Sequence, residues 1–427
     1  MSATQPARGT RDFLPGEIRR REHVISVIRR VYERYGFEPL ETPAFENIET
    51  LLGKYGEEGN KLIFKILRRG EHEGTGEADL ALRYDLTVPL ARVVAQYQND
   101  LPKFFKRYQI QPVWRADRPA RGRFREFYQC DIDAIGSTSP LVEVEQLSAV
   151  SEVLTELGFK DFVIRLNHRQ ILTAILREFF DLEESKHTQA LIALDKLDKI
   201  GAEGVAAEME ERALCSKDAA LQGLQRMLGQ ELEGLKRHLT TIIDLSRSTA
   251  AGDRIRFDPT LARGLSYYTG AIMEINVPDL AGSLGGGGRY DNLIGMFLGR
   301  DVPACGFSLG LERIIVVMTE RNMFPEAVAR GGVDVMVTIW NETGLGEAMS
   351  LASELRANGL RADVYPEPDK LGKQLKYASS RNVPFVTVQG DEERARGEVG
   401  VKNLRSGEQT AVSRAEVARF ILDAGNQ

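Results

Sequence analysis

The feature that most constrains the fold is a change of texture in the middle of the chain. From about residue 168 to 250 the sequence is a nearly unbroken helical pattern without proline, whereas the segments on both sides are rich in strand-type runs. Such a block indicates a helical insertion in a domain whose sheet resumes after it. With 427 residues, 42% of them hydrophobic, the chain is long enough for two or three domains.

The segment before the insertion is predicted to mix helices and strands. A helix ends at Gly36, an extended stretch is punctuated by Pro39 and Pro43, and strand patterns then run into another helix. The β-prone runs "KFFKRYQIQPVW" and "REFYQCDIDAIG" predict a hairpin with residues 115–125 at its tip. A helix over "PLVEVEQLSAVSEVLTELG" and a strand over "FVIRLNH" follow.

The segment after the insertion is predicted to return to strands and then to enter a second domain. The glycines of "GSLGGGGRYDNL" predict a turn, and "GFSLGLER" predicts a tight turn into an apolar helix. Beyond a linker at 324–332, β and α patterns alternate, which is typical of a small α/β domain with a mainly parallel sheet. We therefore expect one domain over 1–325, with the insertion at about 168–250, and a second over 332–427.

Charge, cysteine content and hydropathy argue against a protein that attracts polyanions by its overall charge, a disulfide-rich or metal-binding protein, and a membrane protein. The net charge is −6, so a polyanionic partner must be met by local basic patches. The three cysteines are far apart and the five histidines lack metal-site spacing, so we expect buried thiols in a reducing compartment and no metal site. No apolar run has the length of a signal-peptide core or of a membrane span, which favours a cytoplasmic protein that does not use a membrane.

The loop at 115–125 is the strongest candidate for a binding site. It carries five arginines, namely Arg115, Arg118, Arg121, Arg123 and Arg125. Guanidinium groups suit phosphate oxygens, although a solvated basic hairpin tip is the plainer interpretation. The next strand adds Phe127, a ring able to stack on a base, and the alternating polar residues Gln129, Asp131 and Asp133. These groups together indicate a nucleotide bound beside an amine-bearing small molecule.

Other short segments are weaker candidates. The glycines of "GGGG" allow close backbone approach but lack a Walker pattern. Arg313 lies in the first turns of a predicted helix, where a cation is unfavourable unless an anion is bound. "LARGLSYYTG" holds Arg263, Tyr267 and Tyr268, which packing alone also explains. Asp85 and Thr87 face one way if "LRYDLTVPL" is extended, or form a helix cap if it is not.

Taken in order, these strings resemble those of histidyl-tRNA synthetases, a family of class II aminoacyl-tRNA synthetases. "GFEPLETPAFE", "WRADRPARGRFREFYQCDID" and "GFSLGLER" resemble the three class II motifs, and "LARGLSYYTG" and "GGGGRYDNL" resemble the two peptides peculiar to the histidine enzymes. The resemblance covers nearly the whole chain. It implies an α+β fold, in which an antiparallel-sheet catalytic domain with a helical insertion precedes an anticodon-binding α/β domain.

The resemblance also implies a role for each candidate residue. ATP would meet Arg115 at the α-phosphate, Phe127 on adenine and Arg313 at the γ-phosphate, and Asp117 would also belong to the ATP site. Histidine would meet Asp85, Thr87 and Gln129 at its α-amino group, and Asp133 and Tyr268 at its imidazole, with Tyr267 shaping the pocket. Arg115 and Arg263 would be catalytic. Arg115 would contact the α-phosphate, and Arg263 would face both the reacting carboxylate and the α-phosphate. Ser266 stands where many members have aspartate, and we expect changed contacts there rather than lost activity.

The activity implied is a two-step ligation by a homodimer. L-Histidine and ATP, with Mg²⁺, give histidyl-adenylate and pyrophosphate, and histidine then passes to the 3′ end of tRNA(His). The motif 1 segment, with apolar Phe37, Leu40 and Phe45, would join two copies. One rival is the histidine-sensing regulatory subunit of ATP phosphoribosyltransferase, which normally lacks the anticodon-type domain; another is a synthetase for proline or threonine. Arg263 and residues 332–427 favour the histidine enzyme.

Overall fold

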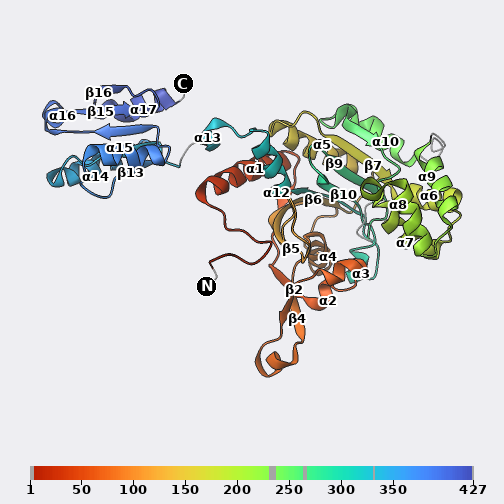
Figure 1. Ribbon diagram of the computed structural model, residues 1–427. Helices are drawn as coiled ribbons and strands as arrows, with labels where there is room; N and C mark the ends of the chain where they lie inside the picture. Colours follow the sequence, from red (N-terminus) through yellow and green to blue (C-terminus); the bar gives the residue numbers. More distant parts are fainter. Residues whose placement is uncertain (1–3, 230–236, 263–266, 330–331, 426–427) are drawn as a thin grey trace. The chain divides into compact units, whose positions relative to one another are not determined.

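The computed structural model describes residues 4–229, 237–262, 267–329 and 332–425 (Figure 1). The chain divides into two compact units. The larger contains residues 1–12 and 21–323, and the smaller contains residues 13–20 and 324–427.

An eight-stranded sheet forms the centre of the larger unit. Its strands follow the order β1-β5-β6-β11-β10-β9-β7-β8. Neighbours are antiparallel except at the two edges, where β1 pairs with β5 and β7 pairs with β8 in parallel. The predicted α+β class with a mostly antiparallel sheet is confirmed. In sheet order the strands are β1 (Glu38–Pro39), β5 (Phe105–Trp114), β6 (Glu126–Ile135), β11 (Ala304–Gly310), β10 (Ser283–Arg289), β9 (Ala271–Asn276), β7 (Val163–His168) and β8 (Ile255–Phe257).

Helices pack on this sheet through apolar stripes. Figure 1 shows α5 and α10 on one side of the sheet and α2, α3 and α4 toward the other. Helix α5 buries Val144, Leu147 and Leu154 at the spacing that an amphipathic helix requires. The helix predicted near the N-terminus is α1, and the chain leaves it through Gly36 at φ 74°. These helices are α1 (Pro15–Arg34), α2 (Ile48–Leu51), α3 (Gly56–Lys61), α4 (Thr87–Gln96), α5 (Leu141–Glu156), α11 (Gly295–Leu298) and α12 (Leu311–Glu320).

In the described part of the chain between β7 and β8, the structure is almost entirely helical, with five α-helices. They are α6 (Arg169–Phe180), α7 (Glu184–Leu194), α8 (Leu197–Glu211), α9 (Lys217–Leu228) and α10 (Arg237–Ser246). Because β7 and β8 pair directly, the chain leaves and re-enters the sheet at one edge, so a helical block of this length does not interrupt the strand order. No helix in the described part of the chain is both long and apolar enough to cross a bilayer.

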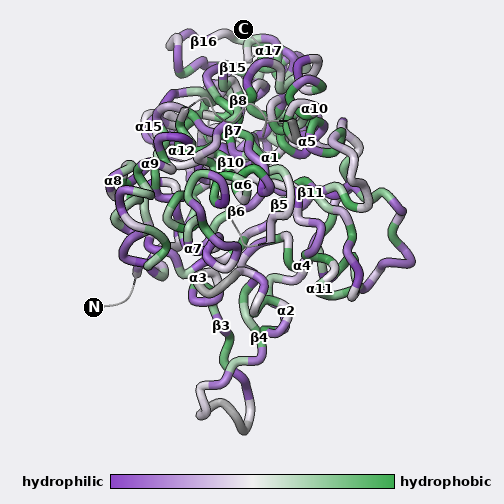
Figure 2. Tube along the Cα trace, turned by 90° about the vertical axis from the view of Figure 1, so that its right-hand side faces the viewer, coloured by the Kyte–Doolittle hydropathy of each residue, from purple (hydrophilic) through white to green (hydrophobic). Residues whose placement is uncertain are grey.

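A small three-stranded sheet projects from the larger unit. It has the order β2-β4-β3, with β2 (Phe45–Asn47), β3 (Lys65–Leu67) and β4 (Ala78–Leu82). Figure 2 shows β3 and β4 extending away from the rest of that unit as an arm. The end of β4 leads into α4, so the arm and the candidate residues Asp85 and Thr87 belong to one continuous segment.

The smaller unit contains a mixed sheet, so the prediction of a mainly parallel one is wrong. Strands β13, β12 and β14 are parallel, but β14, β15 and β16 are antiparallel. The segment between β15 and β16 is too short for a crossover and turns through Gly407 at φ 80°, so these two strands form a hairpin. The elements are α13 (Glu326–Ala329), β12 (Val335–Val337), α14 (Leu345–Ala357), β13 (Ala362–Val364), α15 (Leu371–Ser380), β14 (Phe385–Val388), α16 (Asp391–Arg396), β15 (Glu398–Asn403), β16 (Gln409–Ser413) and α17 (Val417–Gly425).

The glycine run Gly285–Gly288 is a strand, not the predicted turn. It forms most of β10, between β9 and β11. Strand pairing uses backbone groups and needs no side chain, and a Cβ on Gly287 would lie 2.1 Å from the Gly306 carbonyl oxygen. The close strand approach therefore requires glycine, which propensity alone assigns to turns.

Candidate active site

The arginine-rich loop joins two long antiparallel strands, as predicted. Strands β5 and β6 pair from Phe105↔Ile135 to Trp114↔Glu126. Within the loop, Arg123 Nη2 lies 2.7 Å from Asp117 Oδ1, so Asp117 braces the loop. Arg121 forms an ion pair with Glu320, whereas Arg118 is exposed. The loop is thus partly a structured element and partly a basic surface.

Arg115 is held at the base of this loop. Its Nε donates to the Tyr84 carbonyl oxygen at 3.0 Å, and its Nη2 lies 3.5 Å from Gln129 Oε1. Its guanidinium carbon lies 4.3 Å from the centroid of the Tyr84 ring and 5.2 Å from that of Phe127. The predicted phosphate ligand and the predicted stacking ring are therefore neighbours.

Strand β6 aligns the other candidates on one face. Phe127, Gln129, Asp131 and Asp133 alternate along it, as a strand requires. Gln129 Nε2 donates to Ser308 Oγ of β11 at 2.9 Å. Asp133 faces Gly306 of β11, where an added Cβ would lie 1.9 Å from Asp133 Oδ1.

Asp133 lies in a buried polar cluster. The hydroxyl of Tyr290 donates to its Oδ1, and Arg107 Nη2 lies 2.8 Å from its Oδ2. Arg107 is fully buried on β5 and also donates to the Leu86 carbonyl oxygen at 3.3 Å. Burial raises the pKa of Asp133, and the charge of Arg107 opposes that rise.

Asp85 lies two residues before α4, whose N-cap position is Leu86, and its carboxylate accepts from an amide of the first turn, which agrees with the helix-cap interpretation. Its Oδ1 accepts hydrogen bonds from the Val88 amide at 3.1 Å and from the Tyr55 hydroxyl at 2.9 Å. Thr87 is the first residue of α4, so the extended arrangement of Asp85 and Thr87 is wrong. Asp85 is 1% exposed, and burial raises its pKa although its hydrogen bonds lower it.

The paired tyrosines join the same region. The Tyr267 hydroxyl lies 3.4 Å from Asp85 Oδ2. The rings of Tyr267 and Tyr268 are 5.1 Å apart in an edge-on arrangement. A Cβ on Gly288 would lie 3.0 Å from the Tyr268 ring, so the ring rests against the strand backbone. The predicted site residue Arg263, with Ser266, lies outside the described residues.

Arg313 is at the opposite end of the β6 face from Asp133. It lies in the first turn of α12, and its Nη1 donates to the Ser283 carbonyl oxygen at 2.6 Å. A Cβ on Gly122 of the arginine loop would lie 3.3 Å from Arg313 Cγ. Arg313 is therefore next to the hairpin tip, as an anion ligand shared with that loop would require.

Three residues of this region were not predicted as site residues. Tyr290 lies two residues after the glycine run, in the peptide "GGGGRYDNL" that the sequence singled out, but that peptide did not indicate its contact with Asp133. Arg107 is a charged residue within a predicted strand. Because a buried charge is almost always paired, its position could have indicated an ion pair with a neighbouring strand. Nothing in the sequence indicates Tyr55.

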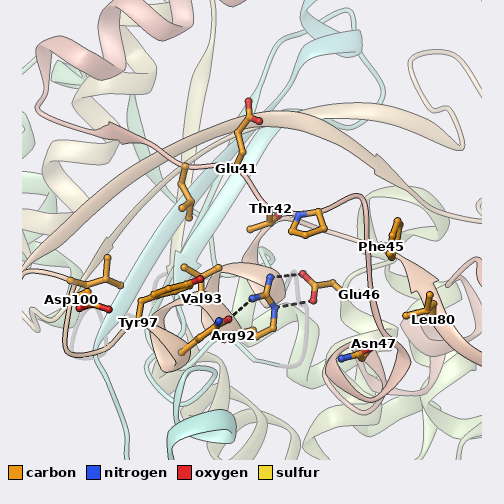
Figure 3. Close-up of a pocket in the computed structure, with 14 residues that line it drawn as sticks. Glu41, Thr42, Phe45, Glu46, Asn47, Leu80, Arg92, Val93, Tyr97 and Asp100 are labelled. Carbon is orange, nitrogen blue, oxygen red and sulfur yellow. Dashed lines mark hydrogen bonds and ion pairs between the residues drawn. The ribbon is translucent and has the colours of Figure 1, made fainter.

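A groove of about 740 Å³ lies elsewhere on the larger unit. Its described lining residues do not include the β6 face. Figure 3 shows the Arg92 guanidinium facing the Glu46 carboxylate there, with contacts of 2.8 Å. Leu40 lines it, and Phe45 is 51% exposed.

Phe37, predicted to join a subunit contact, is only 2% exposed, because it packs against the buried Tyr32 of α1; that part of the prediction is wrong.

The sequence predicts that the three thiols are buried. Cys130 and Cys305 are buried as predicted, but Cys215 is only half-buried. Among the described residues, no group of three or more His, Cys, Asp or Glu side chains has a geometry suited to a metal ion.

Comparison with known proteins places this geometry in a family. Residues 9–314 match the family model described as Histidyl-tRNA synthetase, and residues 334–424 match that described as Anticodon binding domain. A histidine–tRNA ligase of Christiangramia forsetii is 41% identical over 94% of this chain and 96% of its own length. That of Porphyromonas gingivalis is 42% identical over 94% and 95%. The solved histidyl-tRNA synthetase of Nostoc sp. PCC 7120 matches 99% of this chain and 100% of its own, with TM-score 0.82 and 30% identity. The chain belongs to the histidyl-tRNA synthetase family.

Proposed function

We propose that the chain is an ATP-dependent, AMP-forming ligase that joins L-histidine to tRNA(His). The observation that carries this proposal is the β6 face, which sets a ring, an amide and two carboxylates in line beside an arginine-bearing loop. Family membership supports the ligase over the regulatory subunit of ATP phosphoribosyltransferase, and so does the match of residues 334–424 to an anticodon-binding model.

The buried carboxylates are suited to the amino acid. We assign Asp85, Thr87 and Gln129 to the α-ammonium group, because a carboxylate, a hydroxyl and an amide oxygen all accept its hydrogen bonds. We assign Asp133 and Tyr268 to the two ring nitrogens. Tyr290 would hold the Asp133 carboxylate in place through its hydroxyl, and Tyr267 would shape the pocket.

The arginine-bearing end is suited to the nucleotide. Arg115 would contact the α-phosphate and Phe127 would stack on adenine, since the two lie side by side. Arg313 would contact the γ-phosphate from the first turn of α12, and Asp117 would support the loop. Mg²⁺ would enter with ATP as part of the substrate, bound mainly by phosphate oxygens.

The reaction needs no side-chain nucleophile. A histidine carboxylate oxygen attacks the α-phosphate in line, the bond to pyrophosphate breaks, and the adenylate then passes its histidine to the terminal ribose of the tRNA. Catalysis comes from holding two anions together and from stabilising the charge that develops on the α-phosphate. We assign this role to Arg115 and to Arg263, which lies outside the described residues.

Histidine-dependent exchange of pyrophosphate into ATP tests this function directly. We expect exchange with histidine and very little with phenylalanine or glutamine, because buried polar groups are left unpaired by a competitor that cannot match them. Equal exchange with several amino acids, or none with folded protein, would refute the assignment.

We also propose that the protein is a homodimer that acts in the cytoplasm, where the free thiols stay reduced. The groove beside Leu40, with Phe45 and Tyr97 51% and 45% exposed, offers apolar surface for a second copy of the chain. Light scattering at micromolar concentration tests this, and a monomeric mass would contradict it.

The smaller unit would bind the anticodon arm.

A further inference from the structure

Asp131 is a buried carboxylate to which the proposed reaction assigns no role. It lies on the same face of β6 as Gln129 and Asp133, between them, and is 2% exposed. On the neighbouring strands it faces Gln109 of β5 and Ser308 of β11. It therefore stands between the groups proposed for the α-amino group and those proposed for the imidazole.

Asp131 and Asp133 share one described cation, Arg107. Arg107 Nη2 lies 2.8 Å from Asp133 Oδ2 but 3.9 Å from Asp131 Oδ2, and all three side chains are at most 3% exposed. Asp133 also receives the Tyr290 hydroxyl. No described residue donates a hydrogen bond to Asp131 Oδ1. The less well paired carboxylate thus keeps an oxygen for a ligand.

A second buried negative charge is unfavourable unless a proton or a cation accompanies it. Burial is the main cause that raises the pKa of Asp131 to about 7; the charge of Arg107 opposes this rise and the charge of Asp133 adds to it. Ser308 lowers this pKa through a hydrogen bond, and the charge of Asp85 raises it. Near neutral pH the unliganded cluster therefore holds a proton that a bound cation would displace.

Other ionisable groups also face this cluster. Asp85, before α4, is a third buried carboxyl, and burial raises its pKa. Burial raises the pKa values of the remaining groups well above their usual range, so they stay neutral near pH 7: Tyr290 after β10, Tyr32 of α1, Cys130 of β6 and Cys305 of β11. Arg263 lies outside the described residues. Burial also raises the pKa of the neighbouring Asp133, and the pKa of Asp131 lies at about 7.

We propose that the ring pocket takes histidine in its imidazolium form and that Asp131 is the residue that compensates the added ring charge. The inference rests on the proposed function. If Asp131 is protonated before binding, its O–H bond breaks and the proton moves to the ring nitrogen that lacks one. If Asp131 is ionised, that proton comes from solvent. Both routes end in one carboxylate and one imidazolium, and no other reactant is needed.

This arrangement predicts a proton balance that changes sign with pH. With a ring pKa of about 6.5 and a carboxyl pKa near 7, binding at about pH 8 should take up about 0.9 proton from solvent. At about pH 6 both groups are mostly protonated beforehand, so binding should release about 0.7 proton. The crossover lies just below pH 7.

Calorimetric titration of the full-length protein with histidine, in buffers of different ionisation enthalpy, measures this balance. Asp131→Asn should bring the uptake at about pH 8 close to zero, because the ring then binds neutral. The α-amino group contributes equally to both proteins, so their difference isolates Asp131. Asp363→Asn, which changes a half-exposed carboxylate of the smaller unit, is the matched control and should behave as wild type. Equal uptake in wild type and Asp131→Asn would overturn the inference.

A kinetic arm separates this role from a purely structural one. Losing a charge-assisted contact should raise the KM for histidine in Asp131→Asn by roughly 10- to 100-fold with a smaller change in kcat. A triazole analogue of histidine has a less basic ring. The preference for histidine over this analogue in the exchange assay should therefore be smaller for Asp131→Asn than for wild type. Unchanged discrimination contradicts the inference. Histidine-dependent exchange without proton uptake in wild type defeats this inference alone, whereas absence of exchange defeats the proposed function.

Discussion

Replacing Asp131 by asparagine should stabilise the unliganded protein at alkaline pH and leave its stability unchanged in acid. Burial raises the pKa of this carboxyl from 3.8 to about 7. A carboxyl with a raised folded pKa binds its proton more tightly in the folded state, so its stabilising contribution is complete in acid and is lost as the pH rises. The loss runs across the window between those two pKa values.

The magnitude follows from the size of that shift. About three pKa units at 1.36 kcal/mol each correspond to roughly 4 kcal/mol at about pH 8. We expect ~2–4 kcal/mol, because asparagine matches the protonated carboxyl in shape but places an amide near Arg107. In a unit of about 300 residues this corresponds to a rise of roughly 3–6 °C in Tm.

Thermal melts followed by near-UV circular dichroism, without histidine, measure the effect. The difference in Tm between Asp131→Asn and wild type should be close to zero at about pH 4 and grow through neutrality. Asp363→Asn should show no such pH-dependent gain. If Asp131→Asn melts at or below wild type at about pH 8, the charge imbalance inferred around Arg107 is wrong. A more stable protein that binds histidine less well would show that the unpaired carboxylate is retained for function.

Four further changes test other parts of the argument. Arg263→Ala should slow single-turnover adenylate formation by roughly 10²- to 10³-fold with little change in affinity, and lysine should rescue only partly; a near-normal rate would remove Arg263 from the catalytic set. Gly306→Ala should displace the Asp133 carboxylate, since the Cβ would lie 1.9 Å from Oδ1, and an unchanged KM for histidine in exchange assays would contradict this. Arg83→Met removes a buried cation that donates to the backbone carbonyls of Thr42, Pro43 and Pro112 and should cost about 3–5 kcal/mol in chemical denaturation; a loss below about 1 kcal/mol would show that water replaces it. A chain ending near residue 330 should still form adenylate but charge tRNA poorly, an effect that shrinks at high salt; unchanged tRNA affinity would exclude the smaller unit from tRNA binding.

Local patterns predicted much of the site. The period-two alternation of Phe127, Gln129 and Asp133 places them on one face of a strand whatever that strand pairs with. The hairpin was predictable for the same reason, because its strands are neighbours in sequence. The helix near the N-terminus followed from apolar spacing and from the glycine that ends it.

Pairing between distant segments was not predictable in this way. Gly285–Gly288 form a strand because β9 and β11 lie on either side, and the Cβ-free backbone allows the close approach. Thr87 is the first residue of α4, and the Asp85 carboxylate accepts from an amide of that first turn. The sequence alone could not decide between this arrangement and an extended segment. Phe37 is buried against Tyr32, although its neighbours line an open groove.

The sequence by itself determined which chemical groups the chain can present: an arginine-bearing loop, a strand with alternating ring, amide and carboxylates, and a separate α/β segment. These depend on periodicity and on residue type, which are local properties. Only the tertiary structure decided which charges share a partner. Arg107 and Asp131 come from the two strands of one hairpin, whereas Tyr290 follows β10, much later in the chain. The protonation of Asp131 depends on its burial and on its distance from Arg107 and Asp133, which no local pattern encodes.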